Sequence, residues 1–134
     1  MIPYIVDPEA EKAEGLTIAL PWPDRRLSPN ARLHWRPKAA LTAKARADAH
    51  LLALEAAGYA LGSIRADLAG DLPIELTITF YPPDRRHRDD DGMIGGFKAY
   101  RDGIADALHV NDRRFRPFYQ FAGAEPPGRV EVRF

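Results

Sequence analysis

The sequence predicts an α+β domain in which a small mixed β-sheet carries two main helices in the order β-α-β-α-β-β. Three stretches support this prediction: an alanine-rich segment, a strand with period-two apolar residues, and a run with apolar residues at helical spacing. At 134 residues the chain has the size of one domain, so we expect a single domain over 1–134. Residues 1–14 are polar and acidic and are expected to form a loose lead-in.

The sequence of the N-terminal half predicts one strand and one helix. Residues 16–20 are short and of strand type, and the proline-rich segment that follows ends the strand because proline restricts itself and its predecessor. From residue 37 to about 57 the chain is rich in alanine, the best helix former, and Gly58 ends this helix. A flexible stretch is expected around residues 62–70.

The C-terminal half predicts the clearest strand, over residues 72–80, followed by a second amphipathic helix. Glycine disfavours a helix by about 1 kcal/mol relative to alanine, so the pair Gly95-Gly96 suggests that this helix begins near Phe97. The apolar residues on one face of the strand are Ile74, Leu76, Ile78 and Phe80. Two closing strands are predicted at 115–121 and 129–134, with a turn between them.

The composition of the chain excludes several kinds of site and bears on nucleic-acid binding. The chain has no cysteine, which excludes disulfides and thiolate-rich metal sites. It shows no secretion signal and no apolar run of about 18 residues, so we expect a cytoplasmic protein without a membrane span. The formal net charge of zero argues against nucleic-acid binding, but residues 22–46 carry seven basic residues and one acid. We weight this local charge more, because steering depends on where charges lie.

The most informative segment is 84–92, which reads Asp-Arg-Arg-His-Arg-Asp-Asp-Asp-Gly. Adjacent carboxylates repel one another unless a cation lies among them, and Mg²⁺ prefers carboxylate oxygens. Guanidinium groups match phosphate geometry. In an extended segment Asp89 and Asp91 point to the same side, and Asp112 is expected to return to that edge after the second helix. The pattern predicts metal-assisted cleavage of a phosphodiester by Mg²⁺, with Mn²⁺ also suited to the site.

The same residues also have simpler interpretations. Asp91 could serve only as the N-cap of the second helix, and the arginines could serve only to neutralise the acids beside them. Lys98 and Asp102 have the i,i+4 spacing of a solvated ion pair. Trp35 suits the core as well as a stacking role, and Asn30 suits a turn.

Together these motifs resemble the RusA family of Holliday junction resolvases, in a phage- or prophage-like variant. The matching segments are Leu20-Pro-Trp-Pro, Ser28-Pro-Asn30-Ala-Arg-Leu-His-Trp35, Pro83-Asp-Arg-Arg-His-Arg-Asp89-Asp-Asp91, Lys98, Asp102 and Asn111-Asp112. The resemblance implies a homodimeric, Mg²⁺-dependent endonuclease that cuts four-way DNA junctions by paired symmetric nicks. It implies metal binding by Asp89, Asp91 and Asp112, an essential Lys98 and an accessory Asp102.

The chain departs from the family pattern at three points. Gly92 stands where the family usually has Asn, and Asn111 stands where a second Asp is common. The gap from Asp91 to Lys98 is longer than in the better-known bacterial members of the family. Gly92 and the glycine-interrupted helix therefore keep open a non-catalytic module that binds branched DNA. A metal-dependent nuclease acting on flaps or forks is a further alternative, because phosphate contacts do not encode the target that a protein selects. The residues expected to contact DNA are Arg25, Arg26, Asn30, Arg32, Trp35, Arg36, Lys38, Arg85, Arg86, Arg88, Arg113 and Arg114.

Overall fold

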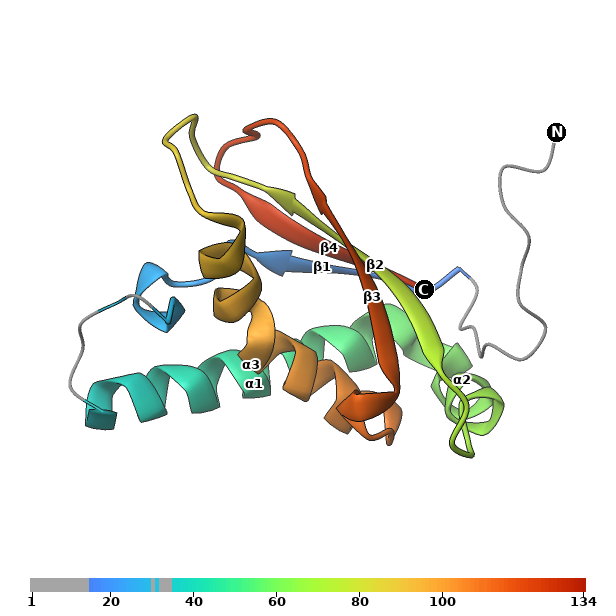
Figure 1. Cartoon of the computed structure of the whole chain (residues 1–134). Helices are drawn as coiled ribbons and strands as arrows, with labels where there is room; N and C mark the ends of the chain where they lie inside the picture. The colour runs from blue at the N-terminus through green and yellow to red at the C-terminus, as the bar shows by residue number, and fades with distance from the viewer. Residues whose placement is uncertain (1–14, 30, 32–34) are drawn as a thin grey trace, which may run out of the picture.

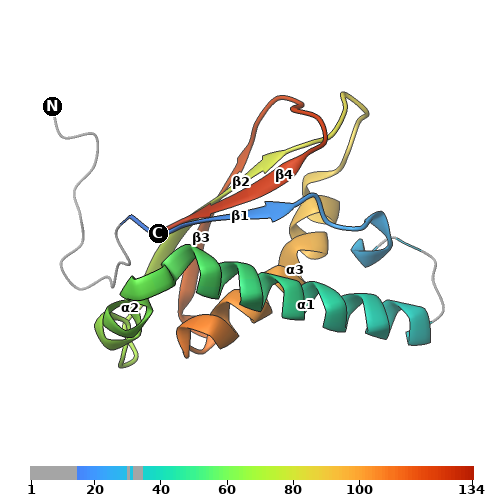
Figure 2. The ribbon, with the colours of Figure 1, turned by 180° about the vertical axis from the view of Figure 1, so that it is seen from behind.

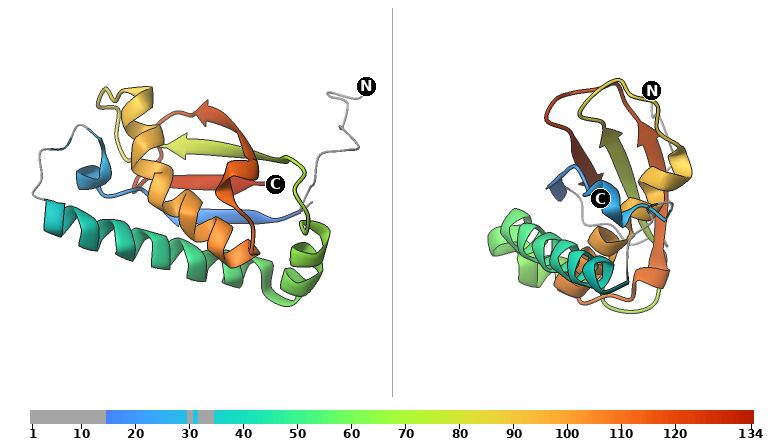
Figure 3. Two further views of the ribbon diagram at one scale, coloured as in Figure 1. Left: turned by 60° about the horizontal axis from the view of Figure 1, so that its bottom comes forward. Right: turned by 90° about the vertical axis from the view of Figure 1, so that its left-hand side faces the viewer.

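The computed structural model of the chain describes residues 15–29, 31 and 35–134. A four-stranded sheet carries the helices on one of its faces, as Figures 1 and 3 show, and this confirms the predicted α+β class. The strands are β1 (Thr17–Pro21), β2 (Ile74–Tyr81), β3 (Phe115–Phe121) and β4 (Arg129–Arg133). The helices are α1 (Trp35–Ala57), α2 (Leu61–Asp67) and α3 (Asp90–Leu108), with 3₁₀ turns η1 (Arg25–Leu27), η2 (Gly58–Ala60) and η3 (Asp112–Arg114).

The sheet is mixed, with the strand order β1-β4-β2-β3. β2 and β3 are parallel and are joined by α3, whereas β4 lies antiparallel between β1 and β2. The turn predicted between the last two strands is therefore a longer connection, residues 122–128, that crosses the end of β2. It is held there because Ala122 N–H donates to the Phe80 carbonyl at 2.9 Å and Glu125 N–H donates to the Pro82 carbonyl at 2.8 Å.

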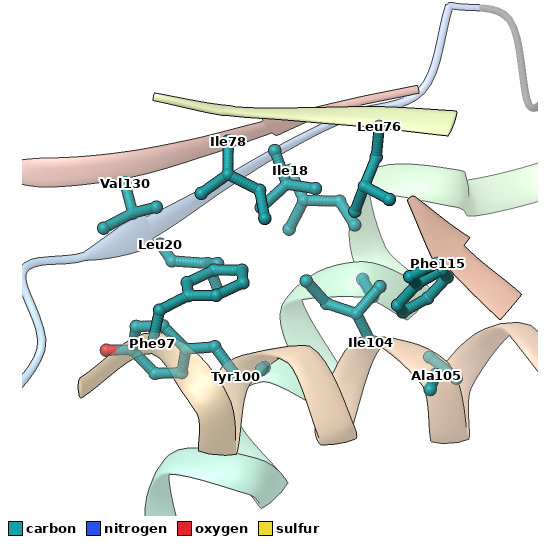
Figure 4. Close-up of a cluster of buried hydrophobic side chains, with 14 of the residues drawn as sticks. Ile18, Leu20, Leu76, Ile78, Phe97, Tyr100, Ile104, Ala105, Phe115 and Val130 are labelled. Carbon is teal, nitrogen blue, oxygen red and sulfur yellow. The ribbon is translucent and has the colours of Figure 1, made fainter. Parts of the chain in front are cut away.

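One hydrophobic core fills the space between the sheet and the helices (Figure 4). Alternate residues of β2 point into it, as the period-two pattern predicts, and each of them is at most 3% exposed. Burial of such a side chain contributes about 1.5–3 kcal/mol. The sheet also contributes Ile18, Leu20, Val130 and Val132, and α3 contributes Phe97, Tyr100, Ile104 and Leu108.

Helix α1 packs against α3 and runs along the β1 side of the sheet (Figure 2). Its buried residues facing the core are Ala45, Ala49, Ala53 and Ala57, which form an i,i+4 row. On α3, a Cβ added to Gly103 would collide with the carbonyl oxygen of Arg46. The two helix backbones therefore approach closely at Gly103. No helix in the described part of the chain is long and apolar enough to cross a membrane.

The structure corrects two boundaries. The stretch 62–70, predicted to be flexible, largely belongs to α2, and the fully buried Leu68 follows this helix. Helix α3 begins at Asp90 and not near Phe97. Packing explains this early start, because Gly95 and Gly96 lie against proline side chains that leave little room for larger residues at Gly95. This contact outweighs the low helix propensity of glycine.

Candidate functional site

The acidic segment lies where the chain leaves β2 and enters α3. In open α/β sheets ligands commonly bind beyond the carboxyl ends of parallel strands, and this segment lies at that edge of the β2–β3 pair. Asp89 is the N-cap residue, with φ −74° and ψ 139°, but its side chain makes no capping hydrogen bond. Asp90 and Asp91 form the first helical turn, so the predictions of an extended Asp89–Asp91 segment and of Asp91 as the N-cap are wrong.

The three carboxylates are exposed to solvent. His87 Nε2 lies 3.4 Å from a carboxylate oxygen of Asp89, and among the described residues no cationic side chain pairs with Asp90 or Asp91. The positive end of the α3 dipole favours the carboxylates, but they still repel one another. A bound cation would relieve this repulsion.

Asp84 holds two of the three arginines that precede the acids, Arg86 and Arg88. The Asp84 carboxylate accepts a hydrogen bond from the backbone N–H of Arg86 at 2.9 Å and lies 3.0 Å from the Arg88 guanidinium. The ion pair with Arg88, aided by the Arg86 bond, lowers the pKa of Asp84. The Arg88 guanidinium also lies over the ring of Trp22, 5.5 Å from its centroid. The arginines therefore leave the three following carboxylates available.

Gly95 allows the basic loop after β1 to pack closely against the first turns of α3. A Cβ added at Gly92 would lie 3.5 Å from Ser28 Oγ, one at Gly96 would lie 3.9 Å from Pro23 Cβ, and one at Gly95 would collide with Pro29. Lys38 Nζ donates to the Ser28 carbonyl at 3.2 Å and ties the loop to α1. As a result η1 packs against α3, and Arg25 lines the same cleft as Asp89.

Asp24 and Arg26 form a bidentate ion pair in this loop. One carboxylate oxygen of Asp24 accepts hydrogen bonds from the backbone N–H and from Nε of Arg26 at 2.9 and 3.0 Å. The other accepts from the guanidinium at 2.7 Å. The side-chain hydrogen bond to Arg26 is the main reason that the pKa of Asp24 falls to about 2.

We expect Asp24→Asn to destabilise the protein near neutral pH by less than about 1 kcal/mol, because the pair is partly exposed and screened by solvent. A depressed pKa in the folded state adds stability above the ordinary carboxyl pKa, and this contribution is lost as the pH falls toward 2. The difference between the variant and the wild type should therefore shrink between pH 5 and pH 2.5 in urea unfolding. A difference that grows on acidification would contradict the assignment.

A cleft of about 230 Å³ opens between the loop, the end of β2 and α3. Arg25, Arg88 and Asp89, all predicted from the sequence, line it. The sequence did not indicate that Trp22, Asp24, Phe80 and Met93 also line this cleft. A tryptophan between two prolines at a strand end was a signal for Trp22, but nothing in the sequence placed it beside Asp89.

Asp91, Lys98 and Asp102 share one face of α3. They are separated by seven and four residues, and at about 100° per residue these steps return to nearly the same face. Lys98 is 68% exposed, and its Nζ lies 3.5 Å from Asp102, so the predicted i,i+4 pair is confirmed. Asp91 and Lys98 are about two turns apart, or roughly 10 Å along the helix.

The structure places Asp112 away from the other acids. Because β2 and β3 are parallel, the residues that precede β3 lie at one end of this strand pair, and the residues that follow β2 lie at the other end. The 19 residues of α3 span about 28 Å between these two ends. Arg101 donates to the Asp112 carbonyl at 3.0 Å and lies 3.7 Å from its carboxylate. The prediction that Asp112 joins Asp89 and Asp91 within one chain is wrong.

In the described ranges, no group of three or more histidines and acids is arranged to hold a metal ion. At the Asp112 end, the Arg114 guanidinium donates to the carbonyls of Leu72 and Leu68 at 2.9 and 2.7 Å, so it holds the turn before β2. Arg113 is exposed beside it. Asn30 and Arg32 lie outside the described residues, as do the side chains of Trp35 and Arg36.

No family model matches the chain. It is similar to an uncharacterized protein of Xylella fastidiosa (strain Temecula1), with 46% identity over 103 residues. The match covers 74% of this chain and 61% of that relative, so the chain spans less than two thirds of the relative's length.

Proposed function

We propose that this chain is a Mg²⁺-dependent, structure-selective DNA endonuclease of the RusA type that resolves four-way junctions by paired nicks. One observation carries the proposal: three exposed carboxylates, Asp89 to Asp91, lie at the carboxyl end of a parallel strand pair between two arginine-bearing segments. These segments are the loop with Arg25 and the turn with Arg88. Together they offer oxygen ligands for a cation and guanidinium groups for a phosphate backbone.

The donor set suits Mg²⁺. This ion is commonly held by one or two carboxylates, with water and substrate phosphate oxygens completing its shell, so Asp89 or Asp91, or both, would suffice in number as protein ligands. When bound, Mg²⁺ supplies an activated water and neutralises charge on the phosphoryl group. Lys98, on the same face as Asp91, would offset charge that develops on the phosphate. Arg25 and Arg88 would position the neighbouring phosphates.

A homodimer fits both the substrate and the position of Asp112. Two identical sites related by two-fold symmetry can meet the two symmetry-related strands of a junction. A second copy could also bring its Asp112 to the acids at the start of α3, which one chain cannot do. Mixing the variants Asp91→Asn and Asp112→Asn tests this arrangement. Partial recovery of cleavage in the mixture supports a shared site, whereas no recovery together with a monomeric mass contradicts it.

The substrate class is tested by comparing cleavage rates on a four-way junction, a flap and a replication fork under Mg²⁺. Phosphate contacts position a protein without selecting its target, so selectivity must come from the shape of the branch. We expect the junction to be cut at least about tenfold faster than the other two substrates. Preferential cutting of the flap or the fork would retain a metal-dependent nuclease but overturn the assignment as a resolvase.

A second candidate is a non-catalytic module that binds branched DNA. It is favoured by the distance of Asp112 from Asp89 and Asp91 within one chain and by glycine at position 92. Such a module would bind a junction equally well with Mg²⁺ and with EDTA and would nick none of the branched substrates. Metal-dependent nicking excludes this candidate.

A further inference from the structure

We propose that the cleft between Trp22 and Met93 binds a single unpaired nucleobase of the DNA that lies across the acidic segment. The inference rests on the proposed function and deepens it, because it assigns a base-binding subsite next to Asp89. The cleft combines a size, a lining and a charge distribution that suit a flat, neutral, aromatic occupant.

The size of the cleft suits a small group. Its volume of about 230 Å³ lies below the range of roughly 300–1,000 Å³ that accommodates drug-sized ligands. The inner wall is apolar, with Trp22, Phe80 and Met93. The ring of Trp22 meets that of Phe80 edge to face, with centroids 6.2 Å apart and an interplanar angle of 78°. This contact fixes the orientation of the indole at the wall.

Aromatic and guanidinium planes are the surfaces on which unpaired bases stack. Both kinds of plane line the cleft, and the Arg88 guanidinium lies over the Trp22 ring, 5.5 Å from its centroid. An entering base would stack on the outer plane of the guanidinium, with the indole behind it. Arg88 is also anchored from behind by Asp84 at 3.0 Å, and its side chain is only 20% exposed. An entering base would therefore meet planar groups that are already positioned.

The charged residues of the cleft favour a neutral base over a phosphate. Asp24 and Asp89 line the cleft, and the hydrogen bonds from Arg26 lower the pKa of Asp24 to about 2, so its carboxylate is ionised at neutral pH. Arg25 and Arg88 line the same cleft and balance these two carboxylates, so the charge of the lining suits a neutral base better than a phosphate. From this position Arg25 can contact the DNA backbone while a neutral base enters. A branch point favours such a base, since stacking is interrupted there and a base pair at that position costs least to open.

The test uses a four-way junction with 2-aminopurine at the branch point, whose fluorescence falls when the base stacks. Protein is added to saturation with Ca²⁺ in place of Mg²⁺, so that binding is observed without cleavage. The cleft is filled in Gly92→Phe, because a Cβ at Gly92 meets only Ser28 Oγ at 3.5 Å. Trp22→Leu removes the indole while keeping an apolar contact with Phe80. Gly62→Phe is the matched control, since nothing lies within 4 Å of a Cβ at that helical glycine.

We expect wild-type protein and Gly62→Phe to quench the probe at least twofold, and Gly92→Phe and Trp22→Leu to lose most of this quenching at full occupancy of the DNA. Circular dichroism verifies that each variant is folded. Equal quenching by wild-type protein and by either folded cleft variant overturns the base-binding inference, even if junction cleavage is normal. Failure of the wild type to bind any branched DNA overturns both the inference and the proposed function.

Discussion

Asp91→Asn should reduce Mg²⁺-dependent cleavage of a four-way junction by at least about a hundredfold and leave junction binding unchanged or tighter. Loss of a partner outside the direct ligand shell already costs about 10–100-fold in affinity or activity at metal sites, so loss of a direct ligand should cost more. Binding should persist because the substitution removes a negative charge beside the DNA backbone. Single-turnover cleavage of a labelled junction and a parallel gel-shift titration measure the two effects separately.

The matched control is Asp67→Asn, the same chemical change at an exposed residue that ends α2. It should leave both readouts within about twofold of wild type, because α2 follows α1 and lies far from the start of α3 (Figure 1). Full cleavage by Asp91→Asn would remove this residue from the catalytic site. Equal losses in both variants would point to a general effect on folding.

Gly103→Ala should destabilise the fold by roughly 3 kcal/mol, the upper end of the cost of overpacking. The added Cβ would collide with the Arg46 carbonyl and would lie 2.9 Å from Ala49 Cβ. Backbone atoms cannot rotate away as a flexible side chain can, so α1 and α3 would have to separate. Urea unfolding followed by circular dichroism measures this loss.

The sign of this prediction is informative, because alanine normally stabilises a helix by about 1 kcal/mol relative to glycine. Gly62→Ala provides the comparison, since that helical glycine has open space around its Cβ position. We expect Gly62→Ala to be neutral or slightly stabilising. If Gly103→Ala behaved in the same way, the close approach of α1 and α3 would be contradicted.

Much of the fold follows from local patterns. The period-two residues of β2 and the alanine-rich composition of α1 identified both elements within one to two residues, since each pattern is repeated over its whole length. The early start of α3 could not be predicted in the same way. Its first turns contain Gly95 and Gly96, and only the contact with the loop after β1 shows why glycine is suited there.

The site was predictable in part. The acids, the flanking arginines and Lys98 are adjacent in sequence or share one helix, so their proximity needed no knowledge of the sheet. Asp112 was misplaced because the second helix was expected to begin near Phe97, whereas α3 starts at Asp90 and its length of about 28 Å separates Asp112 from the acids. The cleft beside Trp22 was missed because it forms where β1, β2 and α3 meet, which depends on how these elements pack.

The most direct test of the proposed function is to incubate purified protein with a labelled synthetic four-way junction and with the matching linear duplex, each with Mg²⁺ or EDTA. We expect paired, symmetric nicks in the junction only, and only when Mg²⁺ is present. Tight junction binding without nicking under Mg²⁺ or Mn²⁺ would contradict the assignment as an endonuclease and would favour the binding module.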